Sequence, residues 1–331
     1  MLKLTLGFFV VILISVSCST KKENQNTDVS KLKNLISSME SEFLEFNEEI
    51  GLLKQYYNFL ITKRDSLLPL ADKNKYHFSG RFSANLPETD STLSTVFIST
   101  NNKDFEKAKE EVALTNGLDS MFFKLFHKYD LIAQVYSNSA SNISRVYPTY
   151  DAQNLIAPEV DITKFNFYYR ADLQNNPNKG PIWIPETYVD PAGSGWILSL
   201  IQPVYEKDEL FAVLGIDFLV NDLVHHYLEV EEGKLLIING NGDIVGGKSS
   251  AIESLSMPPL KNHVYSETIK MDNFRISDFN LFNSKSKEVR QMAQSILFEK
   301  GEQFAFTNEK GLTKAQAVPF EILDWYLLEL N

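Results

Sequence analysis

The apolar residues between positions 30 and 68 recur mostly at steps of three and four. They are Leu32, Leu35, Met39, Phe43, Phe46, Ile50, Leu53, Tyr57, Leu60 and Leu67. This spacing places them on one face of a helix, and charged residues such as Glu40 and Glu48 take the other face. Pro69 then stops the pattern. The sequence predicts a long amphipathic helix over residues 30–68, either a spine for the rest of the chain or a coiled coil that pairs with a second copy.

The clearest strand pattern lies further along, in the two apolar runs 196–205 and 210–218. The short charged stretch Glu-Lys-Asp-Glu at 206–209 separates them. Two apolar runs joined by a short polar turn predict a β-hairpin. The apolar spacing then becomes helical over residues 219–227.

Weaker patterns flank this hairpin on both sides. Residues 131–136 and 143–147 predict an earlier hairpin. After the main hairpin, a strand at 235–238 precedes the tight-turn sequence Asn-Gly-Asn-Gly, and residues 284–299 have helical spacing. The chain closes with three strand-like runs at 303–307, 315–319 and 325–330. The prediction is an α/β protein of the α+β type, with modules over residues 69–230 and 231–331.

The order of motifs over residues 130–230 resembles the double Cache (dCache) family of extracytoplasmic bacterial sensors. An aromatic segment at 165–170 precedes a Tyr-x-Asp at 188–190, and the hairpin ILSLIQPVYEKDELFAVLGIDF and its helix follow. The resemblance implies two stacked PAS-like modules with antiparallel sheets, joined by the long N-terminal helix. The first module would be membrane-distal and bind a ligand, and the second would be membrane-proximal.

The resemblance also implies candidate ligand-binding residues. Amino-acid-binding members clamp the ligand carboxylate with an Arg, hold its ammonium group with aspartates and tyrosines, and close the pocket with a Trp. The matching positions here are Phe167, Tyr168, Tyr188, Asp190 and Asp217. The Arg position is occupied by Phe165, and a phenyl ring cannot pair with a carboxylate. The remaining aspartates and aromatic residues favour a ligand with a cationic group or an amine.

Other interpretations of these residues remain open. Asp217 could cap the helix that follows the hairpin, and Tyr188 and Asp190 could belong to a loop turn, because Pro191 follows. Phe167 and Tyr168 could instead be core residues. Arg145 could reach the pocket from its own hairpin and restore a cation, whereas Arg170 would lie on another face of a helical segment.

Charge and motif content narrow the function classes. The net charge of −11 argues against binding to nucleic acid, which requires basic surfaces. The five histidines never have the spacing of metal ligands four residues apart, and there is no nucleophile elbow and no phosphate-binding loop. We therefore expect no enzyme activity, no cofactor and no bound metal.

The N-terminus predicts export. Residues 1–17 contain Lys3 and an apolar run that is too short to span a bilayer but suits a signal peptide. Cys18, the only cysteine, follows small residues and resembles the lipidation site of a bacterial lipoprotein, with residues 18–29 as a tether. A plain signal peptide or an uncleaved anchor are the alternatives. The expected location is the bacterial cell envelope, on the periplasmic side or the cell surface.

These observations predict a small-molecule sensor that is anchored by lipid and signals through a partner. No second apolar run of membrane-spanning length occurs in the sequence. The expected partner is a second copy bound through residues 30–68, or a membrane-bound kinase or chemoreceptor. A solute-binding lipoprotein that serves a transporter, an envelope enzyme and a purely structural dimer are the competing classes.

Overall fold

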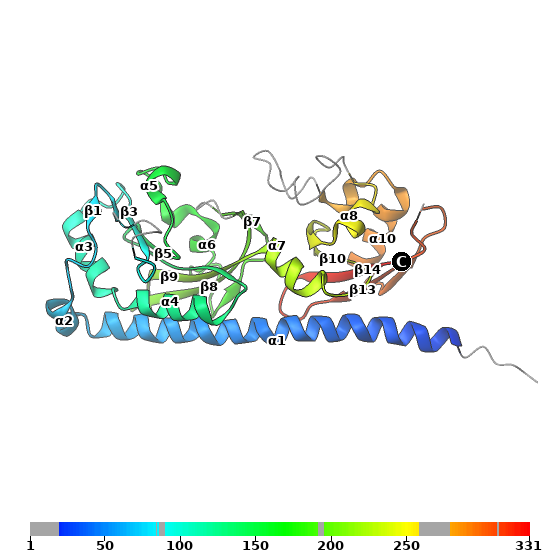
Figure 1. The fold of residues 1–331 in the computed structure, drawn as a ribbon, viewed down its shortest axis with the longest axis horizontal. Helices are drawn as coiled ribbons and strands as arrows, with labels where there is room; N and C mark the ends of the chain where they lie inside the picture. Colours follow the sequence, from blue (N-terminus) through cyan, green and yellow to red (C-terminus); the bar gives the residue numbers. More distant parts are fainter. Residues whose placement is uncertain (1–19, 84, 86–89, 191–194, 258–278, 310) are drawn as a thin grey trace, which may run out of the picture.

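A computed structural model describes residues 20–83, 85, 90–190, 195–257, 279–309 and 311–331. Two antiparallel sheets lie one after the other along a single long helix, α1 (Thr20–Thr62) (Figure 1). The predicted combination of a long N-terminal helix with two antiparallel sheets is confirmed.

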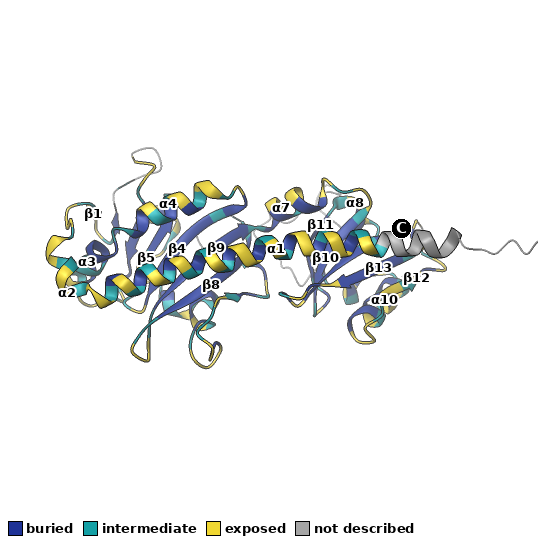
Figure 2. Ribbon diagram, turned by 90° about the horizontal axis from the view of Figure 1, so that it is seen from below, coloured by how far each residue is buried: buried dark blue, intermediate teal, exposed yellow. Residues whose placement is uncertain are grey.

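Helix α1 joins the two sheets through its apolar face. Buried apolar residues on α1 contact the cores of both sheets, and the exposed residues follow the opposite face (Figure 2). The described part of α1 includes residues 20–29, which lie in the segment 18–29 for which a tether was predicted. The segment TKKENQNTDV contains Lys, Glu and Gln, which have good helix propensity and extend a helix that is already packed.

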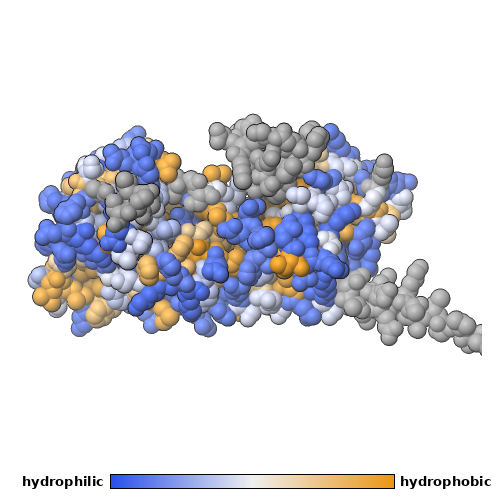
Figure 3. All heavy atoms as spheres, in the orientation of Figure 1, coloured by the Kyte–Doolittle hydropathy of each residue, from blue (hydrophilic) through white to orange (hydrophobic). Residues whose placement is uncertain are grey.

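The C-terminal end of α1 differs from the prediction. The predicted helix 30–68 breaks at Lys63, whose backbone leaves the helical region at φ −101° and ψ 13°. Two short pieces follow, α2 (Arg64–Leu67) and the 3-10 helix η1 (Leu68–Leu70). Figure 3 shows apolar atoms gathered at this end of the molecule, where Leu70 is 83% exposed.

The first sheet has nine strands in the order β1-β2-β3-β5-β4-β9-β8-β6, and β7 also pairs with β8. The strands are β1 (Phe78–Ser79), β2 (Phe82–Ser83), β3 (Thr95–Ile98), β4 (Ile132–Ser139), β5 (Ile143–Tyr147), β6 (Ile182–Trp183), β7 (Tyr188–Val189), β8 (Trp196–Glu206) and β9 (Glu209–Leu219). Strands β8 and β9 form the predicted hairpin. Its turn is limited to Lys207 and Asp208, because the pairing continues to Glu206 and Glu209.

Alternating residues separate the two faces of this sheet. On β9, Leu214, Ile216 and Phe218 point into the apolar core that includes α1. That face is also covered by α4 (Leu118–Lys128), and α3 (Phe105–Leu114) lies near the sheet edge. The opposite face is covered by residues 150–190, which include α5 (Ala152–Leu155), the 3-10 helix η2 (Ile162–Lys164) and α6 (Asn166–Tyr169).

The second sheet has five strands in the order β11-β10-β14-β13-β12. They are β10 (Lys234–Asn239), β11 (Ile244–Gly247), β12 (Gln303–Ala305), β13 (Lys314–Pro319) and β14 (Trp325–Leu330). Helices α8 (Ser249–Glu253) and α10 (Lys287–Leu297), with the 3-10 helix η6 (Leu281–Asn283), cover one face, and α1 covers the other. Their apolar residues form a filled core on that face.

The chain passes from the first sheet to the second through α7 (Val220–Leu223) and a π-helical turn, Val224–Leu228. Two side chains reinforce this region. The Trp325 indole nitrogen of the second sheet donates at 3.3 Å to the carbonyl oxygen of Pro185, which follows strand β6 of the first sheet. The Tyr227 hydroxyl donates to Glu42 on α1. Within the described part of the chain, no helix combines the length and apolar character needed to cross a membrane.

Candidate functional site

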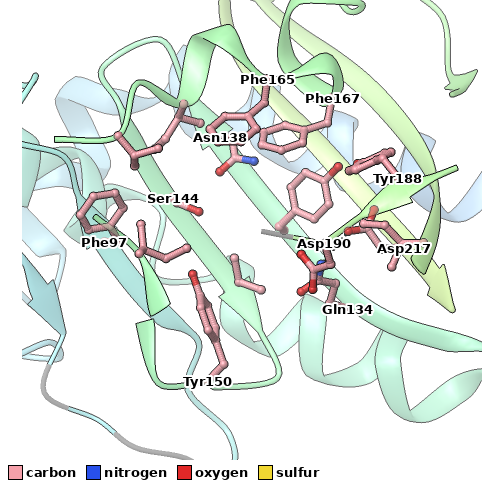
Figure 4. A pocket seen from close by; sticks show the side chains of 16 residues that line it. Phe97, Gln134, Asn138, Ser144, Tyr150, Phe165, Phe167, Tyr188, Asp190 and Asp217 are labelled. Atoms are coloured by element: carbon pink, nitrogen blue, oxygen red, sulfur yellow. Dashed lines mark hydrogen bonds between the residues drawn. The ribbon is translucent and has the colours of Figure 1, made fainter. Parts of the chain in front are cut away.

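A cavity of about 70 Å³ lies between the first sheet and the segment that covers it (Figure 4). The sheet contributes Phe97, Gln134, Tyr136, Asn138, Ser144, Val146, Ile197 and Asp217. The cover contributes Tyr150, Ile156, Val160, Ile162, Phe165, Phe167, Tyr188 and Asp190. Because one water needs roughly 10–15 Å³ measured in this way, the cavity holds several waters or one small ligand.

The cavity floor depends on the pairing of β4 with β9. Gln134 is paired with Asp217, and Tyr136 is paired with Gly215, so alternate residues of both strands face the cavity. A β-carbon at position 215 would lie 1.9 Å from Cζ of Tyr136. Glycine is therefore required at position 215 because the Tyr136 ring occupies the space of a side chain.

The pKa of Asp217 in this cavity is far from its ordinary value. Its side chain is buried, with 2% of the residue exposed. Gln134 Nε2 donates to Asp217 Oδ2 at 2.6 Å, whereas Asp217 Oδ1 has no hydrogen-bond partner among the described residues. Burial, together with the neighbouring carboxylate of Asp190, raises the pKa of Asp217 to about 8, and the Ser199 hydroxyl, the Gln134 amide and the Tyr136 hydroxyl oppose the rise.

Asp190 brings a second buried carboxylate to the same end of the cavity, as Figure 4 shows. It is 4% exposed, and its backbone nitrogen donates to the carbonyl oxygen of Gly195 at 2.8 Å. No Lys, Arg or His is found among the described residues that line the cavity. The described ionisable side chains of Asp190 and Asp217 therefore make this end of the cavity acidic, with no basic side chain among the described lining residues to balance them.

Neither arginine considered from the sequence supplies the cation. Arg145 lies on β5 between Ser144 and Val146, which line the cavity, and its side chain points to the other face of the sheet. Arg170 forms an ion pair with Glu186 at 2.7 Å and does not line the cavity. The interpretation in which Arg145 restores a cation to the pocket is therefore wrong.

Aromatic rings form much of the wall. Phe165 and Phe167 stack with ring centroids 5.1 Å apart and an interplanar angle of 7°. Tyr136 meets Phe167 edge-on at 5.7 Å. The Tyr188 and Ser199 hydroxyl oxygens lie 2.6 Å apart, which holds the Tyr188 ring beside Asp217. Aromatic faces next to carboxylates are suited to a cation.

The structure brings together four of the five residues expected at the site, namely Phe167, Tyr188, Asp190 and Asp217. Tyr168 does not line the cavity and is buried in the apolar cluster that contains Phe167. Cys18 lies outside the described residues.

The two structural alternatives for the acids can also be assessed. Asp217 does not cap the following helix, because α7 starts at Val220 and Leu219 occupies the cap position without a side-chain bond. Tyr188 is part of strand β7 and pairs with Ile197, so it does not belong to a loop turn. Asp190 follows β7, and its backbone nitrogen donates to the carbonyl oxygen of Gly195, so the alternative of a loop position stands for Asp190.

Sequence reasoning missed the polar residues of β4 and β5, namely Gln134, Tyr136, Asn138 and Ser144. A signal for the first three exists in the strand IAQVYSNS, where they occur at every second position of an otherwise buried strand. Within the described residues, no group of three or more His, Cys, Asp or Glu side chains is arranged to hold a metal ion.

Comparisons with known proteins concern the whole architecture. No family model matches the chain, and no curated protein matches it. The ligand-binding domain of the Campylobacter jejuni chemoreceptor Tlp3, in complex with 4-methylisoleucine, is similar over 97% of this chain and 95% of that chain, with a TM-score of 0.52 and 10% identity. The ligand-binding domain of the Pseudomonas fluorescens chemoreceptor CtaA, in complex with L-isoleucine, covers 61% of this chain and 69% of that chain, with a TM-score of 0.41 and 14% identity.

The Tlp3 similarity extends over both sheets and the long helix. At 10% identity it is a likeness of fold. The chain has the double Cache fold, as the motif order predicted.

Proposed function

We propose that this protein is an extracytoplasmic small-molecule sensor whose distal module, residues 69–230, binds a small ligand with a cationic group or an amine. The observation that carries the proposal is the pair of buried carboxylates, Asp190 and Asp217, in a cavity without a basic residue among its described lining. A bound cation would supply the missing charge, and the ligand's N–H groups would satisfy Asp217 Oδ1.

The energetics of burial support a ligand of this charge. An isolated carboxylate is costly in a dry environment, and a paired one is much less so. The aromatic wall adds to the preference, because a cation over an aromatic face gains about 0.5–2 kcal/mol. A carboxylate on the ligand would find no basic partner among the described lining residues, so an amine without a clamped carboxylate is favoured.

The fold comparison adds general support. The Tlp3 domain, which has the same fold, is in complex with 4-methylisoleucine. The cavity of this chain lies in the first module, and the core on the helical face of the second sheet is filled by apolar side chains. An open cavity with unpartnered polar atoms also speaks against a purely structural module with a filled pocket.

The test compares three ligands of similar size and different charge: n-butylammonium, n-butanol and n-butyrate. A ligand that binds only the folded state raises the apparent melting temperature, and calorimetry then measures its affinity. Butylammonium should bind more tightly than butanol, and butyrate should not bind. Asp217→Asn should weaken butylammonium binding about a hundredfold and leave butanol unaffected, since the loss of a buried charge partner corresponds to about 3 kcal/mol or more.

The control for this test is Asp222→Asn, because Asp222 is an exposed carboxylate on α7 away from the cavity. It should leave all three affinities unchanged. Equal binding of butylammonium by the wild-type protein and Asp217→Asn, or preferential binding of butyrate, would contradict the proposal.

The finer parts of the proposal concern anchoring and output. Residues 1–17 act as a signal peptide and Cys18 carries the lipid that holds the protein to a membrane of the cell envelope. Residues 231–331 form the membrane-proximal module. The exposed face of α1 contacts a second copy or a membrane-bound kinase or chemoreceptor, through which ligand binding is reported.

A further inference from the structure

We propose that Asp217 carries a proton in the ligand-free cavity and that a cationic ligand takes the place of this proton, so that binding and proton release are one event. The inference rests on the proposed function, because it concerns the same site. It adds a dependence of sensing on the pH outside the cytoplasm.

The two carboxyl oxygens of Asp217 differ in their hydrogen bonding. Oδ2 accepts from Gln134 Nε2 at 2.6 Å, and Oδ1 has no hydrogen-bond partner among the described residues. An ionised carboxylate buried to this degree would normally have both oxygens satisfied. A protonated carboxyl group carries no charge, so its burial requires no counter-charge.

Groups from each neighbouring element face Asp217. Strand β4 presents Gln134 and Tyr136, strand β8 presents Ser199, and the β7 segment presents Tyr188 and Asp190. The only charged group in this set is another carboxylate. Residues 191–194, Pro-Ala-Gly-Ser, contain no titratable side chain. Two neighbouring carboxylates resist simultaneous ionisation, because each negative charge disfavours the other.

The direction of the pKa shift agrees with this geometry. Burial and the charge of Asp190 raise the pKa of Asp217 to about 8. The nearby tyrosines cannot act as the acid instead, because burial raises the pKa of both Tyr136 and Tyr188 well above its ordinary value. Asp217 is therefore the group whose proton is exchangeable near neutral pH.

The step balances without a further reactant. When the ligand cation approaches, the O–H bond of the Asp217 carboxyl group breaks and the electron pair stays on the carboxylate. The proton passes to the solvent buffer. The cavity thus exchanges one positive charge for another, and the buried acid is never left ionised and unpaired.

The first experiment needs no ligand. The infrared carbonyl stretch of a protonated carboxyl group should be present in the wild-type protein at about pH 6.5, well below the pKa of about 8, and should be absent from Asp217→Asn. Burial also raises the pKa of Glu111, so the band must persist in Glu111→Gln. Absence of an Asp217-dependent band overturns the proposal.

The second experiment uses n-butylammonium, whose charge is constant below about pH 9 because an alkylammonium resembles the lysine side chain, with a pKa of about 10.4. Titration calorimetry in buffers with different ionisation enthalpies should detect close to one proton released per ligand at about pH 7. The affinity should fall about tenfold for each pH unit below the pKa of Asp217.

The possible outcomes distinguish a failure of the proton exchange from a failure of the proposed function. Binding of butylammonium without proton release and without pH dependence overturns the exchange but leaves the proposed function standing. Failure of butylammonium to bind at any pH counts against the proposed function, and it overturns the exchange as well, even if the infrared band is present. Proton release that persists in Asp217→Asn also overturns the assignment to Asp217.

Discussion

Arg145 Nη1 lies 2.6 Å from Asp119 Oδ1, and the two side chains are 3% and 1% exposed. The Tyr76 and Ser94 hydroxyls donate to the same carboxylate at 2.9 and 2.7 Å. This ion pair lies on the face of the first sheet opposite the cavity. The module therefore holds one buried aspartate, Asp119, that forms ion pairs with Arg145 and Lys75, and another, Asp217, that has no basic partner among the described residues of its cavity.

Replacing Asp119 with Asn should destabilise the protein strongly. Arg145 would keep its charge in a buried site without a counter-ion, and breaking such a pair costs about 3–5 kcal/mol. Denaturant unfolding measures this loss as a lower midpoint with an unchanged slope. The matched exposed variant, Asp222→Asn, should stay within about 0.5 kcal/mol of wild type. A loss below about 1 kcal/mol in Asp119→Asn would show that Arg145 finds other partners.

Asp217→Asn should have the opposite effect on stability at alkaline pH. The pKa of Asp217 rises from 3.8 in the unfolded chain to about 8 in the folded protein. Between these values the folded state binds more protons, so the free energy of unfolding falls as pH rises and levels off above about pH 8. The Asn variant lacks this decline.

Thermal unfolding at a series of pH values provides the measurement for Asp217. Relative to wild type, Asp217→Asn should gain about 1 kcal/mol or more at about pH 9, which is roughly 1–2 °C or more in melting temperature for a chain of 331 residues. The difference should shrink toward about pH 4. A constant loss of stability at every pH would mean that the carboxylate is needed for folding.

Local patterns explain why much of the first sheet could be predicted. The hairpin of β8 and β9 has two long apolar runs joined by a charged turn. This pattern lies within one short stretch of sequence, so it is sufficient to predict the hairpin. The resemblance to the double Cache family likewise depended on motif order within this region. Asp190 and Asp217 were found in that way, and both line the cavity.

The rest of the site depends on contacts between distant residues. Gln134 lies opposite Asp217 because β4 pairs with β9 across more than 80 positions of sequence. No local pattern specifies that register. The placement of Tyr168 failed for a different reason: α6 has only four residues, and adjacent residues on a helix point in different directions, so Phe167 and Tyr168 do not both reach the cavity.

Replacing Cys18 with Ala tests the proposed lipid anchor. Acylation requires the cysteine thiol, so the variant should be found in the soluble envelope fraction, whereas the wild-type protein should remain with the membrane. Fractionation followed by immunoblotting provides the measurement. Unchanged membrane association in Cys18→Ala would exclude the lipid as the anchor.

The outer face of α1 is the proposed contact for a second copy. Leu44, Leu52 and Phe59 are 53%, 51% and 50% exposed and recur at steps of eight and seven along the helix. Steps of about two turns place them on one stripe. The double variant Leu44→Glu, Leu52→Glu should weaken self-association at least about tenfold, because charges would be buried in the contact.

Sedimentation equilibrium of the full chain in detergent measures this association. The matched control is Leu155→Glu, which changes a leucine that is also 53% exposed but lies on α5. It should leave the association constant unchanged. A wild-type protein that is monomeric at every concentration, or a dimer that tolerates the double variant, would exclude this face as the contact.

Placing an arginine at position 165 tests whether the charge of the cavity determines its specificity. Phe165 lines the cavity and stacks on Phe167 at 5.1 Å. In Phe165→Arg the guanidinium group would stand near two carboxylates and act as an internal counter-ion. The pKa of Asp217 should therefore fall, and n-butylammonium binding should weaken at least about tenfold, since a neighbouring like charge opposes the ligand.

The companion variant Phe165→Leu separates charge from the loss of the ring. It keeps the cavity acidic and removes one aromatic face, so butylammonium binding should weaken only by the cation–π contribution of about 0.5–2 kcal/mol. Calorimetry with butylammonium and butyrate distinguishes the two variants: only Phe165→Arg should gain measurable affinity for butyrate, because only it offers a carboxylate a basic partner. If Phe165→Arg binds butylammonium as tightly as Phe165→Leu does, the acidity of the cavity does not determine which ligand it accepts.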